Sequence, residues 1–271
     1  MDWIWLYRND RSYLLLPAWR DQGVIAAFTA RTGGVSTGPY ESLNLGLHVG
    51  DRESLVLANR ETVAHDLGFA LEQMVCCEQV HGSRVAVVKA EDAGRGAKVY
   101  RESLPGFDAM VTDCPGIFLT EFYADCIPLY FFDPVRRAVG LAHSGWKGTI
   151  GGVAQATVAT MQDAFGCRLE NISAFIGPGI GPECFAVDQD RLGLVERAFT
   201  FSREIIYPNE GNGHVWDLPL TNRMILRQRG LKPENISGCN ICTACHQDQF
   251  FSYRGARGIT GRMAAVIGLQ D

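Results

Sequence analysis

Two short apolar runs carry reactive side chains at their outer ends. PLYFF comes shortly after Asp125 and Cys126, AVGLA directly precedes His143, and an Asp-Pro pair lies between the runs. Such runs around a turn-forming pair predict a β-hairpin. With the turn centred on Pro134 and Val135, Cys126 falls opposite His143, where Cβ atoms on one face lie about 4.5–5.5 Å apart.

A thiol and an imidazole at that separation have two chemical uses. They can ligate one metal ion, or they can serve as nucleophile and base in a metal-free Cys–His hydrolase or amidase, here with Cys126 and His143. A buried cysteine beside a hydrogen-bonded histidine is the structural alternative. The register matters, because a slip of one residue would put the two side chains on opposite faces.

A metal site needs a third ligand, and the chain contains six histidines. His81, in EQVHGSRV, is expected in a turn before an apolar strand, from which its side chain can project into a cleft. One thiolate and two neutral imidazoles suit Zn²⁺ with a fourth position for water, whose pKa zinc lowers to about 7. Such a site binds copper more tightly than zinc on intrinsic affinity, so Cu²⁺ is a second candidate.

Two glycine-rich turns follow the hairpin. SGWKGTIGGV comes after His143 and is expected to enter a helix, where free N–H groups, the helix dipole and Lys147 could hold an anion. It lacks the Walker A spacing, and GPGIGP at 177–182 does not match GxGxxG. Both turns are also explained as tight connections.

The nine cysteines are expected to be reduced thiols in a cytoplasmic protein, because no export signal is recognisable. Cys239, Cys242 and Cys245 form a C-x2-C-x2-C run, the spacing with which some iron–sulfur ligand sets begin. The usual fourth ligand is missing, and the role of these three cysteines stays open.

Composition narrows the class of protein. The 271 residues carry a net charge of −5 and no run of Lys or Arg, which argues against nucleic-acid binding. No stretch predicts a membrane span, and no feature identifies a protein partner. Since no linker divides the chain, residues 1–271 are expected to form one domain.

The elements that must position these residues do not alternate regularly. The patterns predict strands at 24–30, 84–88, 108–112, 116–120, 172–177, 236–241 and 263–268, and helices at 52–68, 149–166, 190–200 and 217–229. Asp51 is expected to cap the first helix and Gly68 to end it. Interspersed strands and helices without βαβ repeats favour an α+β fold with mixed sheets over a doubly wound Rossmann fold.

Nine motifs between about residues 24 and 268 resemble, in order, those of the YfiH-type family. They are RTGGVSTGPYESLNLGLHVGD, EQVHGSRV, DAMVTD, ADCIPLYFFDP, GLAHSGWKG, IGPGIGPECFAVD, DLPLTNRMIL, NICTACHQDQFFSYR and TGRMAAVIG. This family was long labelled laccase-domain or multicopper polyphenol oxidase and is now regarded as purine nucleoside phosphorylases. The resemblance implies a single-domain α/β sandwich with mixed β-sheets.

The resemblance also implies a site and an activity. The family's metal ligands fall on His81, Cys126 and His143. Its members phosphorolyse adenosine, inosine and methylthioadenosine to the free base and ribose 1-phosphate or its methylthio analogue, and they deaminate adenosine. Here HSGWKG replaces the common HAGWRG, so Lys147 puts a point charge where relatives have a bidentate arginine.

Further roles are hypotheses from residue type and motif position. Asp125 is assigned to proton transfer, and Arg31, Lys147 and Arg254 to positioning phosphate. Arg31 and Asn44 flank a loop able to close over a nucleoside, with structural capping of that loop as the alternative.

Two other classes of function are less consistent with the residues. A multicopper oxidase needs many histidines, usually in His-X-His pairs, and six histidines without such a pair cannot build its clusters. A single copper ion at the Cys/His₂ site would give only weak polyphenol oxidation. A non-enzymatic binding module is the remaining alternative, but no interaction helix or peptide groove is apparent.

Overall fold

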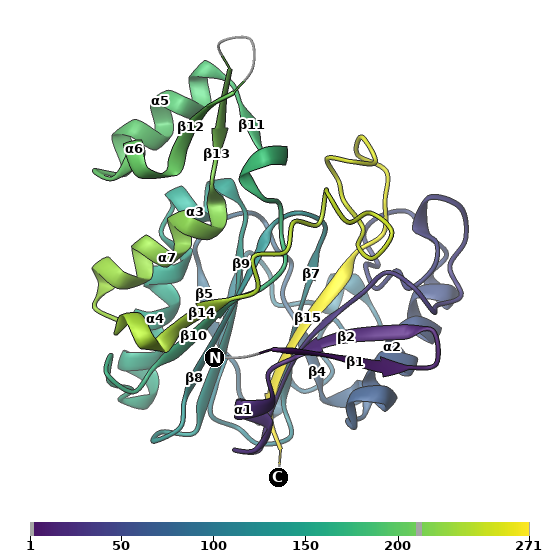
Figure 1. Cartoon of the computed structure of the whole chain (residues 1–271). Coiled ribbons are helices and arrows are strands. Elements are labelled where there is room, and N and C mark those ends of the chain that lie inside the picture. Colours follow the sequence, from purple (N-terminus) through teal and green to yellow (C-terminus); the bar gives the residue numbers. More distant parts are fainter. Residues whose placement is uncertain (1–2, 210–212, 271) are drawn as a thin grey trace.

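Two large β-sheets lie face to face, with helices on their outer sides (Figure 1). The computed structural model describes residues 3–209 and 213–270, so the ends of the predicted domain 1–271 lie outside the described part. One continuous core joins the sheets, with Phe28 and Leu119 from one sheet and Tyr130 and Leu141 from the other. This packing matches the predicted α/β sandwich.

The first sheet is mixed, with the strand order β1-β2-β3-β15-β7-β4. Its strands are β1 (Ile4–Arg8), β2 (Arg11–Leu15), β3 (Val24–Thr29), β15 (Met263–Leu269), β7 (Phe118–Tyr123) and β4 (Met74–Cys76). All its neighbours are antiparallel except β4 and β7. The hairpin of β1 and β2 was not predicted from the sequence.

The second sheet is also mixed and contains the strands nearest the reactive residues. Its order is β14-β10-β8-β9-β6-β5. The strands are β14 (Ile236–Gly238), β10 (Ser173–Ile176), β8 (Ile127–Asp133), β9 (Ala138–Ser144), β6 (Ala109–Thr112) and β5 (Val85–Val87). The two edge pairs are parallel and the central pairs are antiparallel, which confirms mixed sheets without a doubly wound arrangement.

Helices cover the outer faces of both sheets (Figure 1). The outer face of the first sheet is covered by α2 (Glu53–Leu67), and that of the second by α3 (Trp146–Ile150), α4 (Val153–Phe165) and α7 (Leu218–Arg229). The remaining helices are α1 (Pro17–Arg20), α5 (Gln189–Ala198) and α6 (Ser202–Ile205). A small antiparallel sheet of β11 (Ala186–Val187), β13 (Gly213–Trp216) and β12 (Ile206–Asn209) lies beside α5 and α6. No helix among the described residues is both long and apolar enough to cross a membrane.

The layered arrangement explains why the hairpin strands are continuous apolar runs. Along β8, Leu129 and Phe131 face the core under α4 and α7, whereas Tyr130 and Phe132 face the core between the sheets. A strand buried on both faces has no position for a solvated side chain, so alternation with polar residues is lost.

The predicted hairpin is confirmed, but its predicted register is wrong. Asp133 pairs with Ala138 and Pro128 with His143, so residues 134–137 form the loop. The two-residue turn assumed from the sequence needs a positive φ at its first central position, which Pro134 cannot adopt. The observed pairing is shifted by two residues from the predicted one, and Cys126 lies just before the strand. Because the shift is an even number of residues, the side chains of Cys126 and His143 still lie on the same face.

Two predicted helix boundaries also change. Gly68 ends α2 with φ of 87°, as predicted, but the N-cap is Arg52. Asp51 instead accepts hydrogen bonds from Ser36 and Asn44. The helix expected at 149–166 is split, because Gly152 has φ of 82° between α3 and α4.

The Asp133 carboxylate stabilises the hairpin loop and generates a test of the register. Asp133 is fully buried, and its Oδ1 accepts the N–H groups of Val135 at 2.8 Å and Arg136 at 3.1 Å. Asp133→Ala leaves both donors without this acceptor and should lower the free energy of unfolding by about 1–3 kcal/mol in urea denaturation. Val135→Ala, at a side chain 68% exposed, is the matched control and should change little. Equal unfolding midpoints for the two variants would contradict this role.

Candidate metal centre

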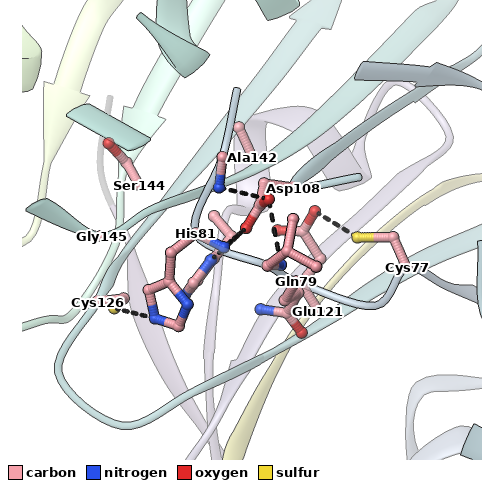
Figure 2. Close-up of polar contacts among 12 residues, drawn as sticks. Cys77, Gln79, His81, Asp108, Glu121, Cys126, Ala142, Ser144 and Gly145 are labelled. Carbon is pink, nitrogen blue, oxygen red and sulfur yellow. Dashed lines mark hydrogen bonds and ion pairs between the residues drawn. The ribbon is translucent and has the colours of Figure 1, made fainter. Parts of the chain in front are cut away.

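Three side chains from separate elements converge at one end of the second sheet. His81 lies in the loop before β5, Cys126 in the turn before β8, and His143 near the end of β9. Their candidate ligand atoms lie within 4.8 Å of one another. The Cys126 thiol faces the His81 ring, with Sγ 3.9 Å from Nε2 (Figure 2). The structure therefore brings together the trio named from the sequence.

One buried carboxylate, that of Asp108, orients two of the three ligands. Its oxygens accept the backbone N–H groups of Val80 at 3.2 Å, His81 at 2.7 Å and Gly82 at 2.7 Å. The same carboxylate lies 3.1 Å from Nδ1 of His143, and the Asp108 carbonyl accepts the His143 N–H at 2.8 Å. Because Nδ1 is engaged, Nε2 of His143 is left to face the other ligands.

The turns that present the ligands have unusual backbone conformations. Gln79, His81 and Asp125 have φ of 60°, 61° and 90°, values that non-glycine residues adopt infrequently. The Gln79 side chain holds its turn to β7 by donating to the Phe122 carbonyl at 2.9 Å and accepting the Phe122 N–H at 2.8 Å. Such conformations persist where surrounding contacts hold them, and they cluster at functional sites.

Gly145 gives the ligands the space they occupy. A Cβ at this position would lie 2.9 Å from the Cys126 sulfur and 3.1 Å from Cδ2 of His81. Any larger residue would push against both ligands. This contact explains why the HSGWKG segment needs its first glycine.

The thiol and the imidazole form a strongly coupled pair. Burial alone would raise the pKa of Cys126, but the charge of His143 and hydrogen bonds with His143 and His81 outweigh it and lower the pKa to about 6. Burial opposes protonation of His143, whereas Cys126 and the hydrogen bond to Asp108 favour it and raise the His143 pKa to about 10. Both shifts favour a thiolate beside an imidazolium over the neutral pair.

The same residues fit a metal ion. A thiolate and two imidazoles are the donor types that Zn²⁺ and copper take in proteins, and a cation can replace the proton that the pair holds. The Asp108–His143 contact has the arrangement with which carboxylates orient metal-binding histidines. His143 is 3% exposed, whereas His81 is exposed, so the site opens to solvent on the His81 side.

A second buried acid lies behind His143 and was not singled out from the sequence. Glu121 is fully buried on β7, where it accepts the Tyr123 hydroxyl at 2.6 Å and the Cys77 thiol at 3.5 Å. Burial raises its pKa to about 8, against the opposing charge of His143. The Tyr123 ring packs edge-on against the His143 ring at 5.4 Å. The ligand is thus held from behind by packed and hydrogen-bonded groups.

Asp125 directly precedes the cysteine ligand, and its carboxylate has defined partners. It accepts the Thr243 hydroxyl and the Arg254 N–H, each at 2.7 Å. The Arg254 guanidinium donates to the Cys184 carbonyl at 3.0 Å. These contacts connect the turn before Cys126 to the C-terminal loops, and they place Arg254 in this connection.

Arg31 and Asn44 take part in loop contacts. The Arg31 guanidinium donates to the carbonyls of Glu41 and Gln247 and lies over the Phe251 ring at 4.6 Å. Asn44 is fully buried, and its Oδ1 accepts the N–H groups of Gly46 and Arg262. These bonds correspond to the capping alternative considered for this loop.

Two cationic side chains, Lys147 and Arg262, differ in their exposure and in their electrostatic coupling to Cys126. Lys147 is exposed in α3, with Nζ 5.6 Å from the centre of the Trp146 ring. Arg262 was not proposed from the sequence. Burial lowers the pKa of its guanidinium, whereas the nearby charges of Cys126 and Asp125 act in the opposite direction without cancelling this effect. The sequence feature that could have identified Arg262 is its position in TGRMAAVIG, a motif to which no chemical role was assigned.

These features define a class of protein: a mixed-sheet α/β sandwich with a Cys/His₂ centre at the end of its second sheet. The model of one family, described as multi-copper polyphenol oxidoreductase laccase, matches residues 25–270. The chain belongs to this family.

Named relatives and a solved structure are similar over nearly the whole chain. Purine nucleoside phosphorylase YlmD of Geobacillus stearothermophilus is 40% identical over 92% of this chain and 91% of the relative. Purine nucleoside phosphorylase YlmD of Bacillus subtilis is 38% identical over 96% of this chain and 95% of the relative. The crystal structure of YlmD from Geobacillus stearothermophilus superposes with a TM-score of 0.94 and 38% identity, covering 100% of both chains.

The coupling of Cys126 to His143 predicts a pH profile for alkylation of the metal-free protein. With a pKa of about 6, the thiol should be largely ionised at pH 7 and lose reactivity as the pH falls below 6. His143→Asn removes the favourable charge and leaves burial, so the pKa should rise and iodoacetamide labelling of Cys126 at pH 7 should slow by about tenfold or more. Peptide mapping would measure the rate, with Cys114 as an internal reference. Unchanged labelling of Cys126 would contradict the pairing.

Proposed function

We propose that this protein is a metal-dependent purine nucleoside phosphorylase. Its substrates are adenosine, inosine and methylthioadenosine, and its products are the free base and ribose 1-phosphate or the methylthio analogue. The observation that carries the proposal is the convergence of His81, Cys126 and His143 around the buried Asp108 carboxylate. The names of the two YlmD relatives support the reaction class.

The three ligands would hold Zn²⁺, with copper as the alternative at the same site. When bound, the ion supplies a Lewis acid that polarises a substrate group. Asp108 keeps the His143 ring in the orientation for ligation through Nε2. The coupled proton of Cys126 and His143 leaves when the ion enters, so metal affinity should weaken as the pH falls.

In phosphorolysis, a phosphate oxygen forms a bond to C1′ of the ribose while the bond from C1′ to the base nitrogen breaks. The electron pair of the broken bond goes to the purine, which takes up a proton. Asp125 is the proposed acid for this proton, because it immediately precedes Cys126 and is only 8% exposed. The chain must also bind the phosphate dianion and exclude water that would compete for C1′.

Four cations are proposed to position phosphate. Three are the sequence candidates Arg31, Lys147 and Arg254, and the fourth is Arg262. The electrostatic coupling of Arg262 to Cys126 and Asp125 supports its inclusion. Asn44 contributes indirectly, since its side-chain oxygen accepts the Arg262 N–H at 2.9 Å.

Deamination of adenosine is proposed as a side activity of the same site. Water would add to C6 of the purine and ammonia would leave, with proton transfers assigned to Asp125. Weak polyphenol oxidation would follow only when copper occupies the site.

The low pKa of Cys126 supports a second candidate, a metal-free hydrolase with Cys126 as nucleophile and His143 as the base that holds the thiol proton. His81 distinguishes the two functions. A metal centre needs its imidazole, whereas a two-residue nucleophile and base would lose only part of its activity without it.

His81→Ala should therefore lose both bound zinc and nucleoside turnover. Zinc-loaded wild-type protein should release adenine from adenosine only when phosphate is present, as measured by chromatography. Removal of one metal ligand should reduce this release by at least about a hundredfold. His65→Ala, at a side chain 91% exposed, is the matched control and should retain both metal and activity.

Other outcomes separate the candidates. Inosine formation with and without phosphate would make deamination the main reaction. Full turnover by His81→Ala without stoichiometric metal would overturn the metal mechanism. Absence of turnover with any nucleoside would favour the Cys–His hydrolase.

Arg262→Lys should weaken phosphate binding more than it slows chemistry. Replacing a guanidinium fork by a point charge removes paired hydrogen bonds, so the KM for phosphate should rise about tenfold with a smaller change in kcat. Lys147→Met, at an exposed position, gives the comparison between the two cations in the same assay. An unchanged phosphate KM in Arg262→Lys would remove Arg262 from the proposed phosphate site.

A further inference from the structure

A second cluster of metal-binding side chains lies among residues that the proposed reaction does not use. The thiols of Cys184, Cys242 and Cys245 lie within 4.8 Å of one another, and the Cys184 and Cys245 sulfurs are 3.3 Å apart. The membership differs from the C-x2-C-x2-C run, because the Cys239 thiol instead points to the Ile176 carbonyl, with Sγ 3.8 Å from the oxygen. Tertiary structure thus replaces Cys239 by a cysteine distant in sequence.

Backbone hydrogen bonds bring the two segments of the cluster together. The Gly179 N–H donates to the Ile241 carbonyl at 3.2 Å, and the Thr243 N–H donates to the Gly179 carbonyl at 3.0 Å. The Gly181 N–H donates to the Cys242 sulfur at 3.1 Å. The loop carrying Cys242 is therefore held in place, and the Cys242 sulfur already accepts a backbone N–H group.

The exposure of the three thiols suits entry of an ion from solvent. Cys242 is buried, Cys184 is partly exposed and Cys245 is exposed. Three sulfur donors with one open side match a thiophilic d¹⁰ ion such as Zn²⁺ or Cu⁺, with a fourth position left for solvent in the case of zinc. A metal ion binds thiolates and displaces the thiol protons, so binding should strengthen as the pH rises.

We propose that Cys184, Cys242 and Cys245 form a second metal site, separate from the Cys/His₂ centre and selective for a thiophilic ion. The site joins the 181–184 turn to the 241–245 loop. Thr243 of this loop donates a hydrogen bond to Asp125, the residue before Cys126. By holding the loop in place, the bound ion therefore stabilises the position of Asp125. Its role is structural support of the first centre, and its existence does not depend on the proposed phosphorylase activity.

Cobalt titration of metal-free, fully reduced protein tests the site. A Cys126→Ser background removes the single thiolate of the first centre, so a thiolate-to-Co²⁺ charge-transfer band can arise only elsewhere. The band should reach saturation at a stoichiometric amount of Co²⁺. When Cys245→Ser is added, the affinity for Co²⁺ measured from this band should fall by at least about tenfold. Cys239→Ser in the same background is the matched control and should leave the band unchanged. No band, or a band that survives Cys245→Ser, would overturn the proposal.

Metal retention and heat stability give a second measurement on the same variants. After loading with Zn²⁺, or with Cu⁺ without oxygen, the Cys126→Ser protein should retain one of these ions and the Cys126→Ser/Cys245→Ser protein should not. At a hundredfold excess of metal over its Kd, the Tm should rise by about 5–10 °C only where the site is intact. Equal retention and equal Tm shifts in both proteins would show that the cluster is not a metal site.

Discussion

The fully buried carboxylate of Asp108 is the interaction on which the candidate centre depends. An unpaired buried anion would be strongly unfavourable, and here three backbone N–H groups and the His143 imidazole surround it. Burial would raise its pKa, but these hydrogen bonds lower it below the usual value. The cost of burial is thus offset only when the 80–82 turn and β9 are both in place. One charge therefore couples the position of His81 to the orientation of His143.

The layered fold explains how such a charge can be held so firmly. The second sheet is covered on both faces, so β6 and β9 are buried strands that place Asp108 and His143 at one end of this sheet. Turns with positive φ at His81 and Asp125 then direct the remaining ligand loops toward that end. Rigid strands position one ligand, and strained turns bring the other two to it. The second thiol cluster extends this arrangement, because its loop is hydrogen-bonded to Asp125 through Thr243.

The family description and the residues emphasise different chemistry. The family model is described as a multi-copper polyphenol oxidoreductase, whereas six histidines without a His-X-His pair do not suit clusters of several copper ions. The one thiol and two imidazoles that converge here suit at most a single ion. The two YlmD relatives carry the name purine nucleoside phosphorylase, which denotes no oxidation chemistry. The low pKa of Cys126 also shows why metal and nucleophile chemistry are close alternatives, since either a cation or a proton on His143 stabilises the same thiolate.

The sequence by itself determined the mixed α/β class and most strands and helices, because apolar periodicity is a local signal. Its resemblance to the YfiH-type family, carried by ordered motifs, pointed to the trio of His81, Cys126 and His143. It did not determine the hairpin register, which depended on the φ of Pro134 and on hydrogen bonds from the loop to Asp133. Only the tertiary structure revealed the role of Asp108, whose partners come from separate segments. For the same reason it exchanged Cys239 for Cys184 in the second cluster: side chains far apart in sequence meet only when the strands that carry them have paired.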